Sequence, residues 1–335
     1  MKAAFIKAIS YYLPETVLSN EEIKREFPEW SIDKISSKTG IYERRIAGPR
    51  ETVGDMAVSA SLKLFEEHAI DPATIDFLML CTQSPDYFLP TTACIVQDRL
   101  GLSKEIGAFD FNLGCSGYVY GLSMARALIV SGTARNVLLV TSETYSKFIN
   151  PKDKANRTIF GDAATASLIS ETGFAEIGNF TFGTDGSGWE QLIIRNGAGR
   201  NRYEKGTDVY AEDVFQKNDD NLFMNGNAIF KFTATIVPEL VEKTLAANNL
   251  GPDQIGTYIF HQANQYMLSY IRKKMDIPEE KFFLFMAKTG NTVSSTIPIA
   301  LYEFMQTRNK QTSTVLLAGF GVGLSWGGTV LKVVR

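Results

Sequence analysis

Histidine and cysteine are scarce in this chain of 335 residues. It has two histidines, His68 and His261, and three cysteines, Cys81, Cys94 and Cys115. No two cysteines form a CxxC pair, so the sequence offers no conventional zinc cage, and we expect no metal centre. Three cysteines in a chain of this length also exclude a disulfide framework.

Long apolar runs and a strong charge of either sign are also missing. The 34 basic and 37 acidic residues give a net charge of −3, which makes bulk nucleic-acid binding unexpected. No run approaches membrane-spanning length, and the first residues, MKAAFIKAIS, lack the cleavage site of a signal peptide. With 44% hydrophobic and 21% charged residues, the sequence predicts a globular, cytoplasmic protein without nucleic-acid or membrane partners.

Short apolar runs alternate with helical patterns along the chain. The runs lie at 75–81, 106–111, 137–141, 257–261, 282–286 and 314–318. Continuous apolar runs of this length are typical of strands buried on both faces. Between them, Val58, Leu62, Phe65 and Ala69 have the spacing of one helix face. The alternation predicts an α/β fold with covered sheets.

The two halves of the chain resemble each other. The matched segments, in chain order, are 68–81 with 248–261, 113–115 with 289–291, and 137–140 with 315–318. Convergent α/β patterning could produce one such match. Several matches in the same order favour a duplicated βα unit, and we predict an N-terminal half at 1–175 and a C-terminal half at 176–335.

The repeat places three polar residues at the ends of predicted strands. Cys115 and Asn291 fall at equivalent strand-to-helix turns, and His261 ends a strand. Sites in open α/β sheets gather at the carboxyl ends of strands, so we expect these residues to form one site. The alternatives are a buried structural cysteine, a core histidine and a turn or cap asparagine.

The setting of Cys115 favours a nucleophile. A thiol at a helix N-terminus experiences the positive end of the helix dipole, which favours the thiolate. Gly114 and Gly117 allow close backbone approach. The pattern predicts an exposed nucleophile on a sharp turn, whereas Cys81 and Cys94 are interpreted as buried structural cysteines.

A glycine-rich segment, AGFGVGLSWGG at 318–328, follows the last buried run. The residues after it, GTVLKVV, have a strand pattern rather than a helical one, so no helix begins there to hold a pyrophosphate. We therefore interpret the segment as a loop whose backbone N–H groups donate to an oxyanion.

Motifs spread over nearly the whole chain resemble those of the β-ketoacyl-acyl-carrier-protein synthase III family, within the thiolase-like condensing enzymes. They are TGIYERRIA (39–47), LGCSGYVYGL (113–122), FGDAATASL (160–168), TDGSGWEQL (184–192), FMNGNAIFKF (223–232), HQAN (261–264), GNTVSSTIP (290–298) and GFGVGLSWG (319–327). The resemblance implies a duplicated five-layer αβαβα fold and a homodimer.

The resemblance also implies catalytic roles. Cys115 would accept an acyl group from a thioester, and its N–H and that of Gly321 would form an oxyanion hole. His261 and Asn291 would hold the thioester carbonyl of malonyl-carrier and stabilise the enolate formed as carbon dioxide leaves. That carbanion would attack the acyl-cysteine, and Asn264 would support the site from behind.

Substrate-binding expectations follow from the same motifs. Leu89 and Phe320 fall where the family shapes its acyl pocket, and the partner subunit of the dimer could supply Leu89. Coenzyme A or phosphopantetheine thioesters would be substrates, with no permanently bound cofactor. The expected partners are acyl carrier protein, acyl-CoA or acyl-carrier, and malonyl-carrier.

Some basic positions depart from the family pattern. Lys34 and Lys38 stand where the family often has Trp and Arg for coenzyme A, Trp30 is out of register, and Lys154 replaces an Arg. Lysine neutralises phosphate but lacks the planar fork of arginine, which leaves coenzyme A or a carrier protein as the acyl donor. The carrier-docking lysines are expected at Lys231, Lys273 and Lys274.

The sequence leaves three other functions open. The first is an acyltransferase that moves the acyl group to an alcohol or amine. The second is a non-catalytic partner subunit, which normally lacks the nucleophile. The third is a thioester hydrolase, which would have no need of Asn291 as an enolate donor.

Overall fold

A nine-stranded mixed sheet runs through the protein in the order β13-β14-β15-β8-β1-β7-β6-β4-β5. The computed structural model describes residues 2–307 and 314–334. The strands of the sheet are β1 (Phe5–Tyr12), β4 (Phe77–Cys81), β5 (Gly107–Phe111), β6 (Asn136–Glu143), β7 (Ala163–Ser170), β8 (Ala175–Thr184), β13 (Thr257–Phe260), β14 (Thr314–Gly321) and β15 (Ser325–Val333).

Short strand pairs and helices complete the described structure. The pairs are β2 (Thr16–Ser19) with β3 (Glu43–Ile46), β9 (Leu192–Ile193) with β12 (Phe223–Met224), and β10 (Val209–Ala211) with β11 (Val214–Lys217). The α-helices are α1 (Asn20–Glu26), α2 (Ile32–Thr39), α3 (Val53–Glu67), α4 (Thr92–Arg99), α5 (Gly117–Val130), α6 (Lys154–Arg157), α7 (Gly226–Ala247), α8 (Gln265–Lys274) and α9 (Thr296–Gln306).

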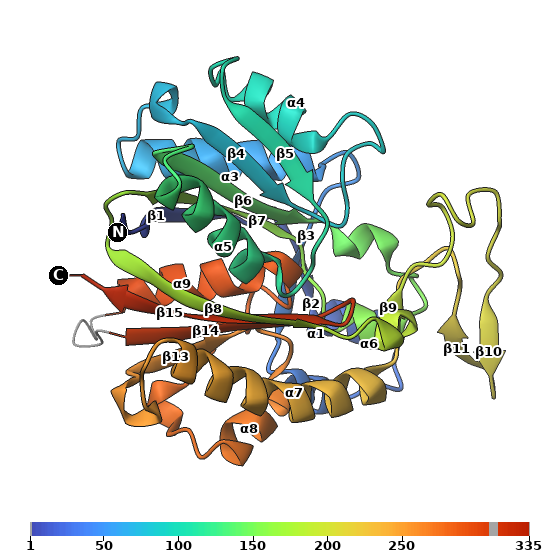
Figure 1. Ribbon diagram of the computed structural model, residues 1–335. Coiled ribbons are helices and arrows are strands. Elements are labelled where there is room, and N and C mark those ends of the chain that lie inside the picture. The colour runs from blue at the N-terminus through green and yellow to red at the C-terminus, as the bar shows by residue number, and fades with distance from the viewer. Residues whose placement is uncertain (1, 308–313, 335) are drawn as a thin grey trace.

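Five layers alternate through the molecule (Figure 1). Helices α3 and α4 cover the outer face of the β1-β7-β6-β4-β5 part of the sheet, and α7 and α8 cover the outer side of the other part. Helices α5 and α9 lie between the two parts and contact strands of both. The predicted αβαβα architecture is therefore confirmed. The proposed boundary between residues 175 and 176 falls at the start of β8 and stays a prediction.

The buried strands agree with most of the apolar runs in the sequence. All of β7 and nearly all of β6 and β14 are buried, as expected for strands covered on both faces. The strands expected at 75–81, 106–111, 137–141, 257–261 and 314–318 correspond to β4, β5, β6, β13 and β14. The glycine-rich segment is followed by β15 and not by a helix, as predicted.

The strand expected at 282–286 is wrong. This run makes one isolated bridge, between Tyr258 and Phe282, and is otherwise irregular. Its backbone is satisfied without a full ladder, because the N–H of Phe283 donates to Tyr258 O at 3.0 Å and that of Phe285 to Gln262 Oε1 at 2.7 Å. A short apolar run can therefore be packed into the core as a loop when individual partners replace the ladder.

Two smaller expectations also need correction. On α3, Val58 and Phe65 are buried as predicted, but Leu62 is exposed and Ala69 lies beyond the end of the helix. Cys94 is exposed on α4 rather than buried, because it lies on the side of that short helix away from the core.

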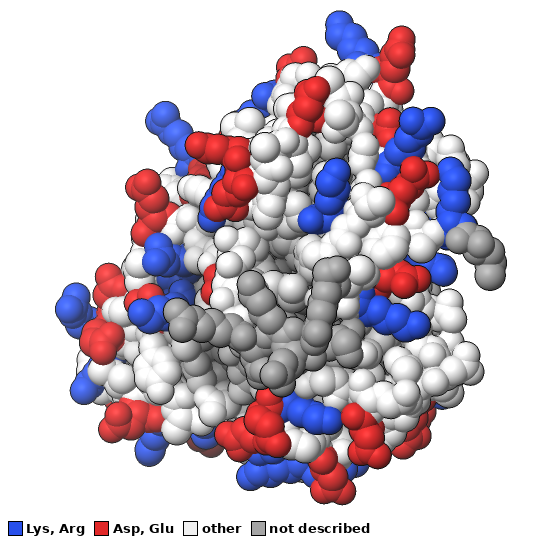
Figure 2. Space-filling view, turned by 90° about the vertical axis from the view of Figure 1, so that its left-hand side faces the viewer, with Lys and Arg blue, Asp and Glu red and all other residues white. Residues whose placement is uncertain are grey.

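The surface is mixed in charge. On the face shown in Figure 2, basic side chains are interspersed with acidic ones, which agrees with the small net charge. Within the described residues, no helix is long and apolar enough to cross a membrane.

Candidate active site

Cys115, His261 and Asn291 line one narrow cavity of about 120 Å³. Phe320 and Gly321 line the same cavity. Cys115 and His261 follow the carboxyl ends of β5 and β13, as expected. Asn291 lies in the loop before α9, and the strand expected ahead of it is absent. The structure therefore brings the predicted nucleophile and both predicted donors into one place.

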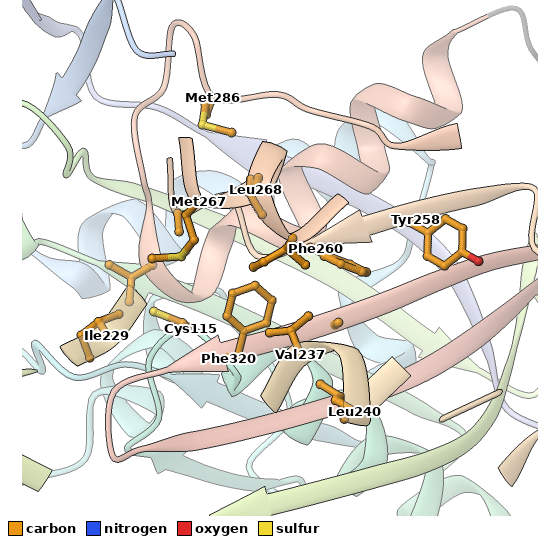
Figure 3. Packing of buried hydrophobic residues seen from close by; sticks show 14 of the residues in the cluster. Cys115, Ile229, Val237, Leu240, Tyr258, Phe260, Met267, Leu268, Met286 and Phe320 are labelled. Atoms are coloured by element: carbon orange, nitrogen blue, oxygen red, sulfur yellow. The ribbon is translucent and has the colours of Figure 1, made fainter. Parts of the chain in front are cut away.

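Cys115 lies in the turn between β5 and α5, and its side chain is 5% exposed. Figure 3 shows its sulfur between the apolar side chains of Ile229 and Phe320. A Cβ at Gly321 would come within 2.7 Å of both Cβ and Sγ of Cys115. Only glycine at 321 therefore lets the thiol lie against the end of β14, where the proposed oxyanion donors would be.

The free thiol is protonated in this environment. Burial raises the pKa of Cys115 to about 12, against a smaller lowering by the N–H of Val322. The sequence predicts that the Cys115 side chain is exposed and that its thiolate is favoured. Both predictions are wrong for the chain alone. The physical reason is that loss of hydration outweighs the favourable backbone dipoles at the start of α5.

His261 follows β13 and is 2% exposed. Its Nδ1 lies 2.8 Å from Thr296 Oγ1, and its Nε2 faces Asn291. Burial lowers the pKa of the imidazole to about 3, so the ring is neutral near pH 7. The Thr296 hydroxyl has one proton and two acceptors in reach, Nδ1 of His261 at 2.8 Å and the carbonyl of Val293 at 3.0 Å. The tautomer in which it donates to Nδ1 puts the ring proton on Nε2, which is then a neutral donor toward the cavity.

Asn291 is fixed in orientation by its own loop. Its Oδ1 accepts from the N–H of Val293 at 2.9 Å, so its NH₂ group must face the cavity. The Nδ2 atom lies 3.5 Å from His261 Nε2. The backbone of Asn291 is held as well, because its N–H donates to Ile159 O and its carbonyl accepts from Gly161. Two nitrogen atoms therefore converge on a point where one oxygen could accept from both.

Two of the predicted supporting residues line the cavity, and a third does not. Asn264 caps α8 by accepting from the N–H of Met267 at 2.9 Å, and it lines the cavity. Phe320 lines the cavity and lies edge-on to His261, with ring centroids 5.9 Å apart. Leu89, by contrast, is 86% exposed and does not line the cavity. One copy of the chain does not bring Leu89 to the site.

A larger cavity of about 720 Å³ adjoins the inner one. Lys34 and Lys38 of α2 line this outer cavity, which shares Ile159 and Asn264 with the inner one. Trp30 lines it as well, although it is out of register with the family pattern. It lies four residues before Lys34, just ahead of α2, and this spacing was the signal in the sequence that could have placed it there.

The remaining predicted lysines lie elsewhere. Lys154 does not line the outer cavity, because it pairs with Glu29 and lies over the ring of Phe27. Lys231, on α7, and Lys273, on α8, are exposed. Lys274 is also exposed, and its Nζ donates to the carbonyl of Ala234 on α7 at 2.8 Å.

Other apolar residues of the inner cavity had no functional signal in the sequence. They are Leu192, Met224, Ile229 and Met267. Each looks like an ordinary core position, and only the folded arrangement shows that they line the cavity of Cys115. Figure 3 shows Ile229 and Met267 near its sulfur.

Five alternating layers, with a cysteine and a histidine at strand ends and an asparagine on a neighbouring loop, define a thiolase-like α/β protein. Two family models match: 3-oxoacyl-[acyl-carrier-protein] synthase III at residues 109–186, and its C-terminal domain at residues 245–333. The chain belongs to the β-ketoacyl-acyl-carrier-protein synthase III family of condensing enzymes.

Full-length relatives and solved structures agree with this assignment. A β-ketoacyl-[acyl-carrier-protein] synthase III of Clostridium perfringens is 36% identical over 99% of this chain and 100% of its own. That of Caldanaerobacter subterraneus is 34% identical over 98% of each chain. A crystal structure of a 3-oxoacyl-(acyl-carrier-protein) synthase III has a TM-score of 0.94 at 44% identity, covering 98% of this chain and 99% of that one. The synthase III of Pseudomonas aeruginosa has a TM-score of 0.84 at 30% identity, with 99% and 100% covered.

Proposed function

We propose that the chain condenses an acyl thioester with malonyl-acyl-carrier-protein by decarboxylative Claisen chemistry. The observation that carries the proposal is the approach of His261 Nε2 and Asn291 Nδ2 to 3.5 Å within the cavity that Cys115 lines. Two neutral donors that converge on one point suit the oxygen of an enolate. Family membership supports the same chemistry.

In the first step, the Cys115 sulfur attacks the carbonyl carbon of the acyl thioester. The oxyanion that forms would accept from the N–H groups of Cys115 and Gly321. The C–S bond to the donor then breaks, and the proton lost by Cys115 leaves with the departing thiol. Covalent capture divides the condensation into two easier steps, and donor binding must help to ionise a thiol whose pKa is raised to about 12.

In the second step, malonyl-carrier replaces the departed thiol. His261 and Asn291 would hold its thioester carbonyl oxygen, and loss of carbon dioxide would place negative charge on that oxygen and the adjacent carbon. The carbanion attacks the acyl carbon on Cys115, the new C–C bond forms, and the cysteine leaves as thiolate, which takes a proton from water to restore the thiol. Because burial lowers the pKa of His261 to about 3, the donor is a neutral imidazole throughout.

The outer cavity suits the rest of the donor. We assign it to the phosphopantetheine arm and, for coenzyme A, to the nucleotide, with Trp30 available for stacking and Lys34 and Lys38 for phosphate. Lys154 contributes less because Glu29 already pairs with it. Lys231, Lys273 and Lys274 are assigned to docking of the acidic carrier protein.

A homodimer would complete the acyl pocket. Leu89 belongs to an exposed apolar segment that also contains Tyr87 and Phe88, and all three side chains are largely exposed in one copy. Such a patch favours a protein interface. We therefore propose that each subunit inserts this segment, and with it Leu89, beside the acyl pocket of the other.

The first test follows covalent adducts by intact mass. The protein is incubated with a panel of acyl-CoA and acyl-carrier thioesters, and each adduct is mapped to a residue. An adduct on Cys115 is expected, with Cys94→Ala as the matched control because Cys94 is the exposed cysteine. An adduct that is absent from Cys115 with every donor, or that survives in Cys115→Ala, would contradict the proposal.

The molecule that accepts the acyl group distinguishes the remaining candidate functions. Malonyl-carrier added to the adduct should release carbon dioxide and β-ketoacyl-carrier. Transfer to an alcohol or amine without decarboxylation would indicate a different acyltransferase, and release of free acid without an acceptor would indicate a hydrolase.

A further inference from the structure

Glu143 is a fully buried carboxyl close to the active site that the proposed reaction does not use. It is the last residue of β6 and has 0% exposure. Its hydrogen-bond partners are neutral: the N–H of Gln83 and the hydroxyls of Ser84 and Ser294. A buried carboxyl without a cationic partner is costly, so a specific structural purpose is expected.

One of these bonds reaches the loop that carries Asn291. Ser294 Oγ donates to Glu143 Oε1 at 3.1 Å, and Ser294 directly follows Val293, whose N–H orients the Asn291 side chain. Val293 has a φ of +56°, a left-handed conformation that is unfavourable for a β-branched residue. The loop therefore depends on its surroundings, and the bond to Glu143 is an anchor next to the strained residue.

A second bond reaches the turn that carries Cys115. The Gln83 N–H donates to both oxygens of Glu143, at 3.3 and 3.1 Å. The Gln83 side chain then donates from Nε2 to Asn112 Oδ1 at 2.9 Å, and its Oε1 lies where a Cβ of Gly114 would come within 2.5 Å. Gln83 thus packs directly against the residue before the nucleophile.

The two links meet at a single carboxyl that joins segments far apart in the sequence. We propose that Glu143 is a positioning residue that holds the loop of Asn291 in register with the turn of Cys115, through Ser294 on one side and Gln83 on the other. The inference rests on the proposed function, because register between these segments matters only if an acyl group on Cys115 meets an enolate held by Asn291. Burial raises the pKa of Glu143 to about 8. Above that pH both oxygens of the carboxylate accept from the three donors, whereas an amide offers one acceptor oxygen.

The test separates the two half-reactions in Ser294→Ala. Acylation of Cys115 is measured by intact mass, and condensation by formation of β-ketoacyl-carrier. This variant removes the bond from the Asn291 loop to Glu143 and leaves the bonds of Gln83 to Glu143 in place. Acylation is therefore expected within about twofold of the unsubstituted protein while condensation falls about tenfold, as expected for small misplacement of a reacting group. Equal loss of both steps, or no loss of either, would overturn the inference.

Substitutions of Glu143 itself add a graded comparison. Glu143→Ala cuts both links and should slow both steps, while Glu143→Gln keeps one acceptor oxygen and should retain more condensation than the alanine variant. Equal condensation in the two variants would contradict the role of the acceptor oxygens. Ser61→Ala is the matched control, because Ser61 is also fully buried but donates within α3 to Ala57 O at 2.8 Å, and both steps should be unchanged.

The outcomes distinguish this inference from the proposed function. If the unsubstituted protein forms no acyl-Cys115, the proposed function fails and this inference fails with it. If that protein condenses normally and Ser294→Ala does so at the same rates, only the positioning role of Glu143 is overturned.

Discussion

The side-chain nitrogens of His261 and Asn291 lie 3.5 Å apart, Nε2 to Nδ2, in the cavity that also holds the Cys115 sulfur. Each of the two is fixed from behind, His261 by the Thr296 hydroxyl and Asn291 by the Val293 N–H. The pair therefore needs little rearrangement to accept an oxygen, which is the condition for effective electrostatic stabilisation of a developing enolate.

The first prediction concerns the division of labour in this pair. His261→Ala and Asn291→Ala should each leave acylation of Cys115 within a fewfold of the unsubstituted protein. Condensation should fall about 10²–10³-fold in each, the usual cost of removing one oxyanion donor. Intact mass measures the first step and product formation the second. Loss of acylation in Asn291→Ala, with the fold intact by circular dichroism, would contradict its assigned role.

The second prediction concerns the space at Gly321. In Gly321→Ala the new methyl group would approach Cys115 Sγ to 2.7 Å, so the thiol must move away from the proposed oxyanion donors. Acylation should slow about 10²-fold, measured as the rate of adduct formation. Gly199→Ala is the control, because nothing lies within 4 Å of the position of its Cβ. Equal acylation rates in the two variants would show that this close approach is unimportant.

The third prediction concerns pH. Burial lowers the pKa of His261 from 6.5 to about 3, so the ring stays neutral as the pH falls through 6.5 and becomes charged only near 3. The rate of condensation from preformed acyl-Cys115 is measured against pH by stopped-flow product analysis. This rate should not change near pH 6.5 through protonation of His261. If the rate falls as the pH drops through 6.5, and this fall is absent in His261→Ala, the imidazole is not held neutral.

The same burial has a consequence for stability. The unfolded chain binds a proton at His261 below pH 6.5, whereas the folded chain does not until about pH 3. The contribution of His261 therefore lowers the free energy of unfolding as pH falls from 6.5 toward 3 and is constant above 6.5.

The fourth prediction concerns the donor cavity. Lys34→Ala and Lys38→Ala should each raise KM for acyl-CoA about fivefold, the effect of losing roughly 1 kcal/mol of phosphate attraction. Lys154→Ala is the matched control, because this lysine is paired with Glu29 and lies outside the outer cavity. The KM of this variant for acyl-CoA should change less. Initial-rate measurements at several salt concentrations provide the test. A larger effect in Lys154→Ala would place the phosphate on that side instead.

The sequence predicts the reactive groups well because they sit at local, recognisable positions. Cys115, His261 and Asn291 each follow an apolar run or a glycine turn, and the internal repeat brings those ends together. The state of the thiol is not local: its burial depends on Ile229 and Phe320 from distant elements. Glu143 shows the same limit, because in the sequence it is simply a glutamate at the end of a strand.

Two other positions were not predicted correctly from the sequence, and each has a physical reason. The apolar run at 282–286 has the composition of a strand, but single bonds to Tyr258 and Gln262 satisfy its backbone in place of a ladder. Trp30 is four residues out of register with the family pattern, and the course of the chain into α2 brings it to the outer cavity.

The most direct test of the account is a chase of acyl-Cys115 with malonyl-carrier, followed by intact mass. The adduct should disappear only when malonyl-carrier is added, with carbon dioxide and β-ketoacyl-carrier formed in equal amounts, and it should persist in Asn291→Ala. Loss of the adduct without malonyl-carrier, or its persistence in the unsubstituted protein after malonyl-carrier is added, would contradict the account.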